Sequence, residues 1–252
     1  SAEHNYQHPS PVPGSGAVFL RAGGASDDAD ARVVLLDLET GVPDTLGVGT
    51  RAAFASGYLL VSSADGTLLA QRFDPGARET QGAAVAVLDG VRTAGPGVGE
   101  FALAATGLAF QTGAPGAEQL VIEGPGGPAV VPLTTGADFE SPTLSPDGRR
   151  IAFEVEGDDR GIWIWDRDQR TQQLLLSEAR SPVWTSDGSR VAFRSLDEDD
   201  GFRIEWVPVV GSAPPETLLA VDFPVHPVSF SPDDAGLALR ALRDDDGDIG
   251  FL

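Results

Sequence analysis

The chain has 252 residues, with 17 basic and 38 acidic side chains and a formal net charge of −21. This negative charge would repel nucleic-acid phosphates, so we expect no nucleic-acid partner. The chain has no cysteine, which excludes disulfides and thiolate chemistry, and it has no run of 18 apolar residues, so we expect no transmembrane segment of its own.

The first half of the chain reads as short strands separated by turns. A polar arm, residues 1–16, is followed by apolar runs at residues 17–20 and 32–37. Eight further runs follow, at residues 52–54, 58–61, 67–73, 85–88, 100–103, 108–110, 120–122 and 130–133. Ala64-Asp65-Gly66 is typical of a hairpin turn. We expect no helix of more than one or two turns.

The second half contains a repeat. Residues 141–153 (SPTLSPDGRRIAF) return 40 residues later as residues 181–193 (SPVWTSDGSRVAF), and each copy is followed by an acidic loop and an apolar run. A third variant begins at His226 and ends with an apolar run at residues 248–252. A period of about 40 residues with several short strands indicates a β-propeller blade.

The repeat also has a local interpretation. Because the residue before a proline favours extended backbone, Ser-Pro predicts an extended inner strand. Pro-Asp-Gly then predicts a tight turn into a second strand, since proline fixes φ and glycine accepts positive φ.

We therefore predict an all-β fold, a single six-bladed propeller of four-stranded antiparallel blades. The predicted blades are residues 10–48, 49–90, 91–136, 137–178, 179–222 and 223–252, the last completed by residues 2–8. The chain ends at the third strand of the last blade, and an open edge would expose unpaired backbone groups. We expect residues 2–8 to pair with residues 249–252 and supply the missing outer strand.

Two stretches resemble a known family. Residues 145–153 (SPDGRRIAF) and 162–166 (IWIWD) resemble the WD-like repeats of TolB-type periplasmic propellers. The pieces GYLLV from Gly57, GTLLAQRFDP from Gly66, GLAF from Gly107 and EQLVI from Glu118 are similar, in order, to the six-bladed propellers behind bacterial Ser/Thr kinase domains. The resemblance implies a scaffold and a periplasmic or other extracytoplasmic location, with a cytoplasmic location as the alternative; it specifies no chemistry.

The sequence offers little for catalysis. A nucleophilic triad needs a serine or cysteine beside a histidine base, and the chain has three histidines, no cysteine and no Gly-x-Ser-x-Gly elbow. We expect no enzymatic activity. The alternative is a channel-mouth enzyme, a metal-dependent lyase or hydrolase, or a propeller that binds a small ligand.

The start of each inner strand should face the central channel of a propeller. Glu140, Arg180 and His226 hold this position in the last three blades. If a small ligand binds, we expect these three side chains to contact it. A structural role for a histidine that precedes a proline is the competing interpretation.

Acidic loops recur between the second and third strands of four blades. Equivalent loops of a propeller emerge on one face, so these carboxylates predict an acidic rim that would steer a basic partner or a cation. The rim comprises Asp27, Asp28, Asp30, Asp158, Asp159, Asp199, Asp200, Asp244, Asp245 and Asp246. Asp244, Asp246 and Asp248 are also candidate ligands for Ca²⁺, the one cofactor the sequence suggests, against the alternative of a solvated hairpin.

The function we expect is a non-catalytic protein-binding propeller. It would act as a scaffold, a sensor-type module or an accessory subunit of a larger assembly, a membrane complex included. The sequence does not identify the protein partner.

Overall fold

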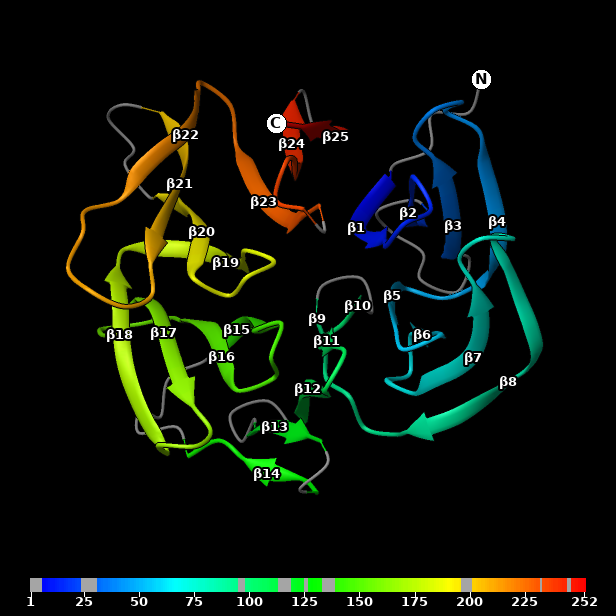
Figure 1. The fold of residues 1–252 in the computed structure, drawn as a ribbon, viewed down its shortest axis with the longest axis horizontal. Helices are drawn as coiled ribbons and strands as arrows, with labels where there is room; N and C mark the ends of the chain where they lie inside the picture. Colours follow the sequence, from blue (N-terminus) through cyan, green and yellow to red (C-terminus); the bar gives the residue numbers. More distant parts are fainter. Residues whose placement is uncertain are drawn as a thin grey trace.

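The computed structural model describes residues 6–23, 31–94, 98–112, 119–124, 127–132, 139–195, 201–231, 233–243 and 246–252. The described strands form seven sheets, of which six are blades and one is a two-stranded hairpin, and the blades follow one another around a central axis (Figure 1). No helix in these residues is long and apolar enough to cross a membrane. The prediction of an all-β, six-bladed propeller is confirmed.

Each blade is an antiparallel sheet whose strands are in chain order, with the first strand innermost. Blade 1 contains β1 (Tyr6–Val12), β2 (Ala17–Ala22), β3 (Arg32–Asp37) and β4 (Pro43–Val48). Blade 2 contains β5 (Arg51–Ala55), β6 (Tyr58–Ser62), β7 (Leu68–Asp74) and β8 (Glu79–Leu88). Blade 3 contains β11 (Phe101–Ala104), β12 (Gly107–Thr112), β13 (Gln119–Glu123) and β14 (Ala129–Val130), preceded by a small hairpin of β9 (Thr93–Ala94) and β10 (Val98–Gly99).

The remaining blades hold the sequence repeat. Blade 4 contains β15 (Phe139–Leu144), β16 (Arg150–Val155), β17 (Gly161–Asp166) and β18 (Thr171–Ser177). Blade 5 contains β19 (Ala179–Trp184), β20 (Arg190–Ser195), β21 (Phe202–Pro208) and β22 (Glu216–Val221). Blade 6 contains β23 (Val225–Phe230), β24 (Leu237–Arg243) and β25 (Asp246–Phe251).

The prediction that residues 2–8 supply the outer strand of blade 6 is wrong for those of them that the structure describes. Tyr6 and Gln7 pair with β2 as the innermost strand of blade 1, so they are not the outer strand of blade 6, and residues 2–5 lie outside the described residues. Blade 1 therefore begins at β1 and has four consecutive strands of its own. Among the described residues, side-chain packing joins blade 6 to blade 1: Ile249 of β25 packs with Tyr6 against the buried side chains of β2.

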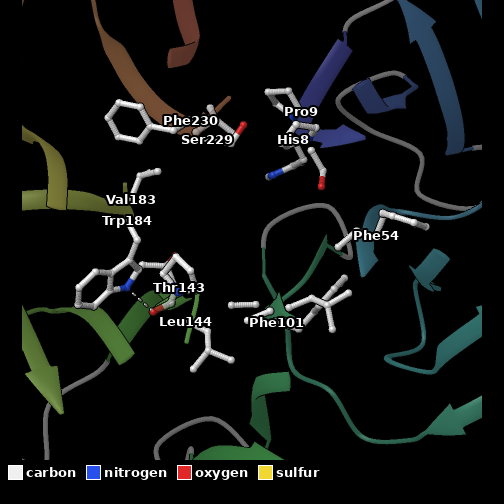
Figure 2. A pocket seen from close by; sticks show the side chains of 18 of the residues that line it. His8, Pro9, Phe54, Phe101, Thr143, Leu144, Val183, Trp184, Ser229 and Phe230 are labelled. Carbon is white, nitrogen blue, oxygen red and sulfur yellow. Dashed lines mark hydrogen bonds between the residues drawn. The ribbon is translucent and has the colours of Figure 1, made fainter. Parts of the chain in front are cut away.

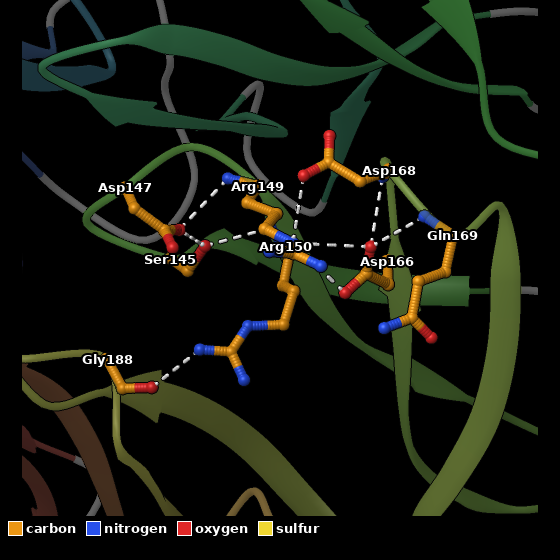
Figure 3. Close-up of polar contacts among 8 residues, drawn as sticks. All are labelled: Ser145, Asp147, Arg149, Arg150, Asp166, Asp168, Gln169 and Gly188. Carbon is orange, nitrogen blue, oxygen red and sulfur yellow. Dashed lines mark hydrogen bonds and ion pairs between the residues drawn. The ribbon is translucent and has the colours of Figure 1, made fainter.

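The turn between the first and second strands repeats its hydrogen bonds. In blade 4 the hydroxyl of Ser145 donates to Asp147 Oδ1 at 2.5 Å, and the backbone N–H of Arg149 donates to the same oxygen at 3.0 Å (Figure 3). Thr185 and Asp187 repeat the arrangement in blade 5. The backbone N–H of Ser189 and then the Thr185 hydroxyl lower the pKa of Asp187 to about 2. Because hydrogen bonds to the ionised form favour it, these aspartates act as charged turn acceptors.

The Ser-Pro segments depart from the predicted extended backbone. His8, Ser141 and Ser181 each precede a proline, and each has a positive φ, between 51° and 55°, where its strand carries a β-bulge. Such backbone costs on the order of 1–3 kcal/mol for a residue with a side chain. The bulge turns the Ser181 N–H toward the carboxylate of Glu154 in the preceding blade, at 3.1 Å. A hydrogen bond to a charged group contributes a similar amount, roughly 1.5–3 kcal/mol, and offsets the strain.

The core lies between neighbouring blades. Ile151, Ala152 and Phe153 of β16 are consecutive and fully buried, because each middle blade is covered on both faces by its neighbours. This double coverage explains why the second strands read as apolar runs instead of alternating with polar residues. Truncation of Phe153 to alanine would cost about 3–5 kcal/mol.

Polar contacts also join adjacent blades on the turn side. Arg150 donates to the Gly188 carbonyl at 2.8 Å (Figure 3), and its guanidinium lies 4.9 Å from the ring centre of Trp184. The indole N–H of Trp184 donates to the Thr143 carbonyl at 3.1 Å (Figure 2). The inner strands are thereby held in a fixed relation to one another around the axis.

Candidate ligand site in the central channel

The inner strands of all six blades enclose a cavity on the propeller axis. Its volume is about 670 Å³, within the range typical of small-molecule sites. Figure 2 shows side chains from several blades converging on it, among them His8, Phe101, Thr143, Trp184 and Ser229. The charged and titratable side chains that line the cavity are His8, Arg51, Glu100, His226 and Arg240.

A ring of polar side chains surrounds the channel at the level where the inner strands begin. In each blade one residue of the innermost strand, or just before it, lies beside a polar residue at the end of the second strand. We call these twelve residues the polar ring. They are the pairs Gln7 and Arg21, Arg51 and Ser62, Glu100 and Gln111, Glu140 and Glu154, Arg180 and Arg194, and His226 and Arg240.

Charge in the polar ring is segregated by blade. Blades 3 and 4 contribute its three glutamates, Glu100, Glu140 and Glu154. Blades 5, 6, 1 and 2 contribute five arginines, which we call the arginine arc. The arc comprises Arg180, Arg194, Arg240, Arg21 and Arg51. A protein of net charge −21 thus concentrates positive charge on one side of its axis.

Arg180 and Arg51, at the two ends of the arginine arc, contact carboxylate or carbonyl oxygens. Arg180 pairs with Glu154 at 3.3 Å and with Glu156 at 2.7 Å. Arg51 donates to the Gly99 carbonyl at 3.2 Å and lies over the ring of Phe101. These contacts compensate part of the cost of burying the two cations.

The middle of the arginine arc is less well compensated. Within the described residues, neither Arg194 nor Arg240 forms an ion pair, and the Nε atom of each is buried without a hydrogen-bond partner. Burial, followed by the positive charge of Arg21, lowers the pKa of Arg240; burial, followed by Arg180, lowers that of Arg194. Arg240, which lines the cavity, would therefore gain from a negative group in the channel.

Two histidines lie within this positive field and are neutral at pH 7. Burial, then Arg194, Arg240 and Arg180, lowers the pKa of His226 to about 4. Burial, then Arg51, Arg240 and Arg21, lowers the pKa of His8 to about 3. His8 therefore feels arginines from both neighbouring blades, 6 and 2.

The contacts of His226 determine its tautomer. Arg194 can only donate, and its Nη1 lies 3.4 Å from His226 Nε2, so this nitrogen carries the lone pair. The proton is then on Nδ1, which donates to Ser181 Oγ at 3.1 Å. In this arrangement the imidazole accepts nothing from Ser181, so it does not act as a base toward that hydroxyl.

The glutamates opposite the arc have raised pKa values. Burial raises the pKa of Glu154 to about 7, although the Ser181 N–H and Arg180 oppose it. Burial also raises the pKa of Glu100, with Arg51 opposing. Burial thus favours the protonated form of both carboxyls, and Glu154, with a pKa of about 7, can donate as well as accept a hydrogen bond at neutral pH.

All three predicted channel residues belong to the polar ring, but of the three only His226 is among the residues that line the cavity. His226 and Arg180 are close enough to interact electrostatically, while Glu140 is exposed and lies beside Glu154. The prediction missed the second-strand members of the ring. Their signal was present in the repeat: the second strands end in an apolar residue followed by a polar one, as in Phe153-Glu154 and Phe193-Arg194.

Most of the predicted acidic rim lies outside the described residues: Asp27, Asp28, Asp30, Asp199, Asp200, Asp244 and Asp245. Asp158 and Asp159 are described and exposed, and Asp246 and Asp248 belong to β25. The described residues contain no group of three histidine, aspartate or glutamate side chains that could hold a metal ion. The Ca²⁺ site at Asp244, Asp246 and Asp248 stays a prediction.

No protein-family model and no curated protein matches the sequence. The fold, however, is shared with many solved structures. TolB from Acinetobacter baumannii is similar with a TM-score of 0.65 at 14% identity, over 94% of this chain. The chain spans 66% of the length of that TolB.

Two further structures show how widely this fold is used. Oligogalacturonate lyase from Vibrio parahaemolyticus has a TM-score of 0.63 at 14% identity, over 98% of this chain and 77% of its own. The β-propeller domain of the Trilobed protease from Pyrococcus furiosus, described as having an open velcro topology, has a TM-score of 0.61 at 10% identity, over 99% and 82%. At these identities the likeness establishes architecture only. The chain is thus a six-bladed β-propeller with the TolB-like fold.

Proposed function

We propose that this chain is a non-catalytic binding module that recognises its partner through the central channel. The observation that carries the proposal is the polar ring: twelve equivalent positions around one axis hold five arginines, three glutamates and a neutral histidine beside a cavity of about 670 Å³. Burying so many polar groups is costly unless they contact a ligand or one another.

The chemistry of His226 favours binding over catalysis. Its lone pair faces Arg194, and its pKa of about 4 makes it a weak base. A general base should have a pKa near the working pH. The Ser181 hydroxyl beside it accepts a hydrogen bond from the imidazole N–H, so no base activates Ser181 in this contact.

The alternative function is a channel-mouth enzyme. The shared fold with an oligogalacturonate lyase is the observation in its favour. A metal-dependent lyase or hydrolase would need a set of metal ligands, and the described residues supply no group of three. We therefore rank the enzyme second and derive no reaction step for it.

The protein partner and the extracytoplasmic location remain proposals. They follow from the resemblance to TolB-type propellers and from the acidic surface charge, which favours a basic partner. Fractionation of the native cells, with this chain detected in the periplasmic or in the cytoplasmic fraction, tests the location.

A channel-blocking variant tests the proposed function. Ser229 lines the cavity, whereas Val210 is 83% exposed on the outer surface. The Ser229→Trp variant and the matched Val210→Trp control would be immobilised beside the unmodified chain and exposed to extract of the native organism. We expect a bound partner to be retained by the unmodified chain and the control but lost from Ser229→Trp. Equal retention by all three would refute channel recognition, and substrate turnover by the purified chain would refute the non-catalytic role.

A further inference from the structure

The wall of the cavity formed by blades 6, 1 and 2 is positively charged. Arg240 and Arg51 both line the cavity, from blades 6 and 2. His8 also lines it, from blade 1 between those two blades, and both arginines lower its pKa. The three side chains therefore face one region of the channel.

This region carries positive charge that is only partly balanced. Arg51 has Glu100 as an electrostatic partner, and the described residues give Arg240 no ion pair. His226, the neighbour of Arg240 across the β23–β24 pair, is neutral. Replacing water around such a guanidinium with an anion would provide charge-assisted hydrogen bonds.

We propose that the channel binds a small molecule bearing an oxyanion, held by Arg240 and Arg51 beside His8 and His226. The inference rests on the proposed function and names the chemical class of the ligand. Guanidinium groups have the planar donor geometry that carboxylates and phosphates match with two parallel hydrogen bonds. Neutral His8 can donate one N–H without adding to the buried positive charge, whereas the N–H of His226 is already donated to Ser181.

The opposite wall limits what the rest of the ligand can be. Glu100 of blade 3 lines the same cavity, opposite Arg240 of blade 6 and next to Arg51 of blade 2, and its carboxyl has a raised pKa. It can accept from hydroxyl or amino groups, or donate when protonated. A ligand with an acid group at one end and hydroxyl or amino groups at the other therefore fits the two walls. The bulged residues Ser141 and Ser181, which also line the cavity, supply further hydroxyls.

Calorimetric titration of the purified chain with two probes, inorganic phosphate and succinate, tests the proposal at constant ionic strength. Arg240→Gln removes the charge but keeps a polar side chain. Arg149→Gln is the matched control, because Arg149 lies in the turn between β15 and β16, is paired with Asp166 and Asp168 (Figure 3), and is not among the residues that line the cavity. Ser229→Trp, which fills the channel without changing charge, is the second test variant.

We expect saturable binding of at least one probe, at least tenfold weaker in Arg240→Gln and within twofold of the unmodified value in Arg149→Gln. Binding of phosphate alone assigns a phosphorylated ligand, and binding of succinate alone assigns a carboxylic acid. The proposal is overturned if neither probe saturates, if both arginine variants weaken binding equally, or if Ser229→Trp still binds normally. If no anion binds while Ser229→Trp still loses the partner from the extract, the proposed function stands and only the ligand class is wrong.

Discussion

Replacing His226 with glutamine should make the protein less sensitive to acid. The pKa of His226 is lowered from 6.5 in the unfolded chain to about 4 in the folded protein. As the pH falls below 6.5, the unfolded chain takes up a proton that the folded protein does not. The stability associated with neutral His226 is therefore complete above pH 6.5 and is lost progressively as the pH falls toward 4.

The size of the effect follows from this difference. Between pH 7.5 and pH 5.0 the unfolded imidazole becomes protonated, and each pH unit below 6.5 costs about 1.4 kcal/mol, so the free energy of unfolding should fall by about 2 kcal/mol through His226 alone. Glutamine does not titrate, so His226→Gln should lack this loss. The carboxylates and His8 titrate in both proteins, and their contributions cancel in the comparison.

Urea denaturation followed by tryptophan fluorescence, at pH 7.5 and at pH 5.0, measures the four free energies of unfolding. The difference in free energy of unfolding between the two proteins should shift by about 2 kcal/mol in favour of His226→Gln when the pH is lowered from 7.5 to 5.0. Because Arg240 contributes to the lowered pKa, the shift should shrink when the same comparison is made in Arg240→Gln. A gap that is the same at both pH values would mean that His226 titrates normally and that the arginine arc does not act on it.

Two further stability predictions concern single contacts. Gly57 and Gly66 have similar left-handed φ values, 82° and 85°, but only at Gly66 would an added Cβ meet the carbonyl oxygen of Val91. Gly57→Ala should therefore cost about 1 kcal/mol and Gly66→Ala roughly 1–3 kcal/mol more, compared by urea midpoint; equal losses would show that the backbone near Val91 yields without cost. Trp184→Phe keeps an aromatic ring but is smaller than the buried indole and removes its 3.1 Å hydrogen bond to the Thr143 carbonyl, so it should lower the free energy of unfolding by at least roughly 1–2 kcal/mol, and an unchanged thermal midpoint would contradict that contribution.

The sequence alone determined the repeat and therefore the fold. Ser/Thr-x-Asp-Gly turns at a spacing of 40 residues predicted hairpins at fixed intervals, and the structure has them at Ser145 and Thr185 with the same hydrogen bonds. Turn chemistry and apolar runs are local signals, because each depends on a few consecutive residues. When similar blades pack side by side, closing them into a ring covers both faces of every blade.

The way in which the ring closes depended on the tertiary structure. The polar arm suggested an outer strand for blade 6, but Tyr6 and Gln7 form the inner edge of blade 1. A sequence can show that a terminal segment is able to pair as a strand, but it does not show which of two sheet edges that strand joins. The same limit applies to Ser141 and Ser181, where Ser-Pro predicted extended backbone. Hydrogen bonds from their bulged N–H groups to carboxylates of the preceding blade instead support a positive φ.

The polar ring shows most clearly what the sequence could not supply. Arg194, Arg240 and Arg21 are each 14 residues from their pair partner and 30 or more from every other member of the ring, and in the chain each is an ordinary charged residue after an apolar run. The propeller brings them to one side of one axis, where burial and mutual repulsion lower the pKa values of Arg240, Arg194, His226 and His8. The sequence determined which residue types end the second strands. Only the tertiary structure decided that these strand ends converge, because electrostatic interaction depends on distance and burial and not on separation along the chain.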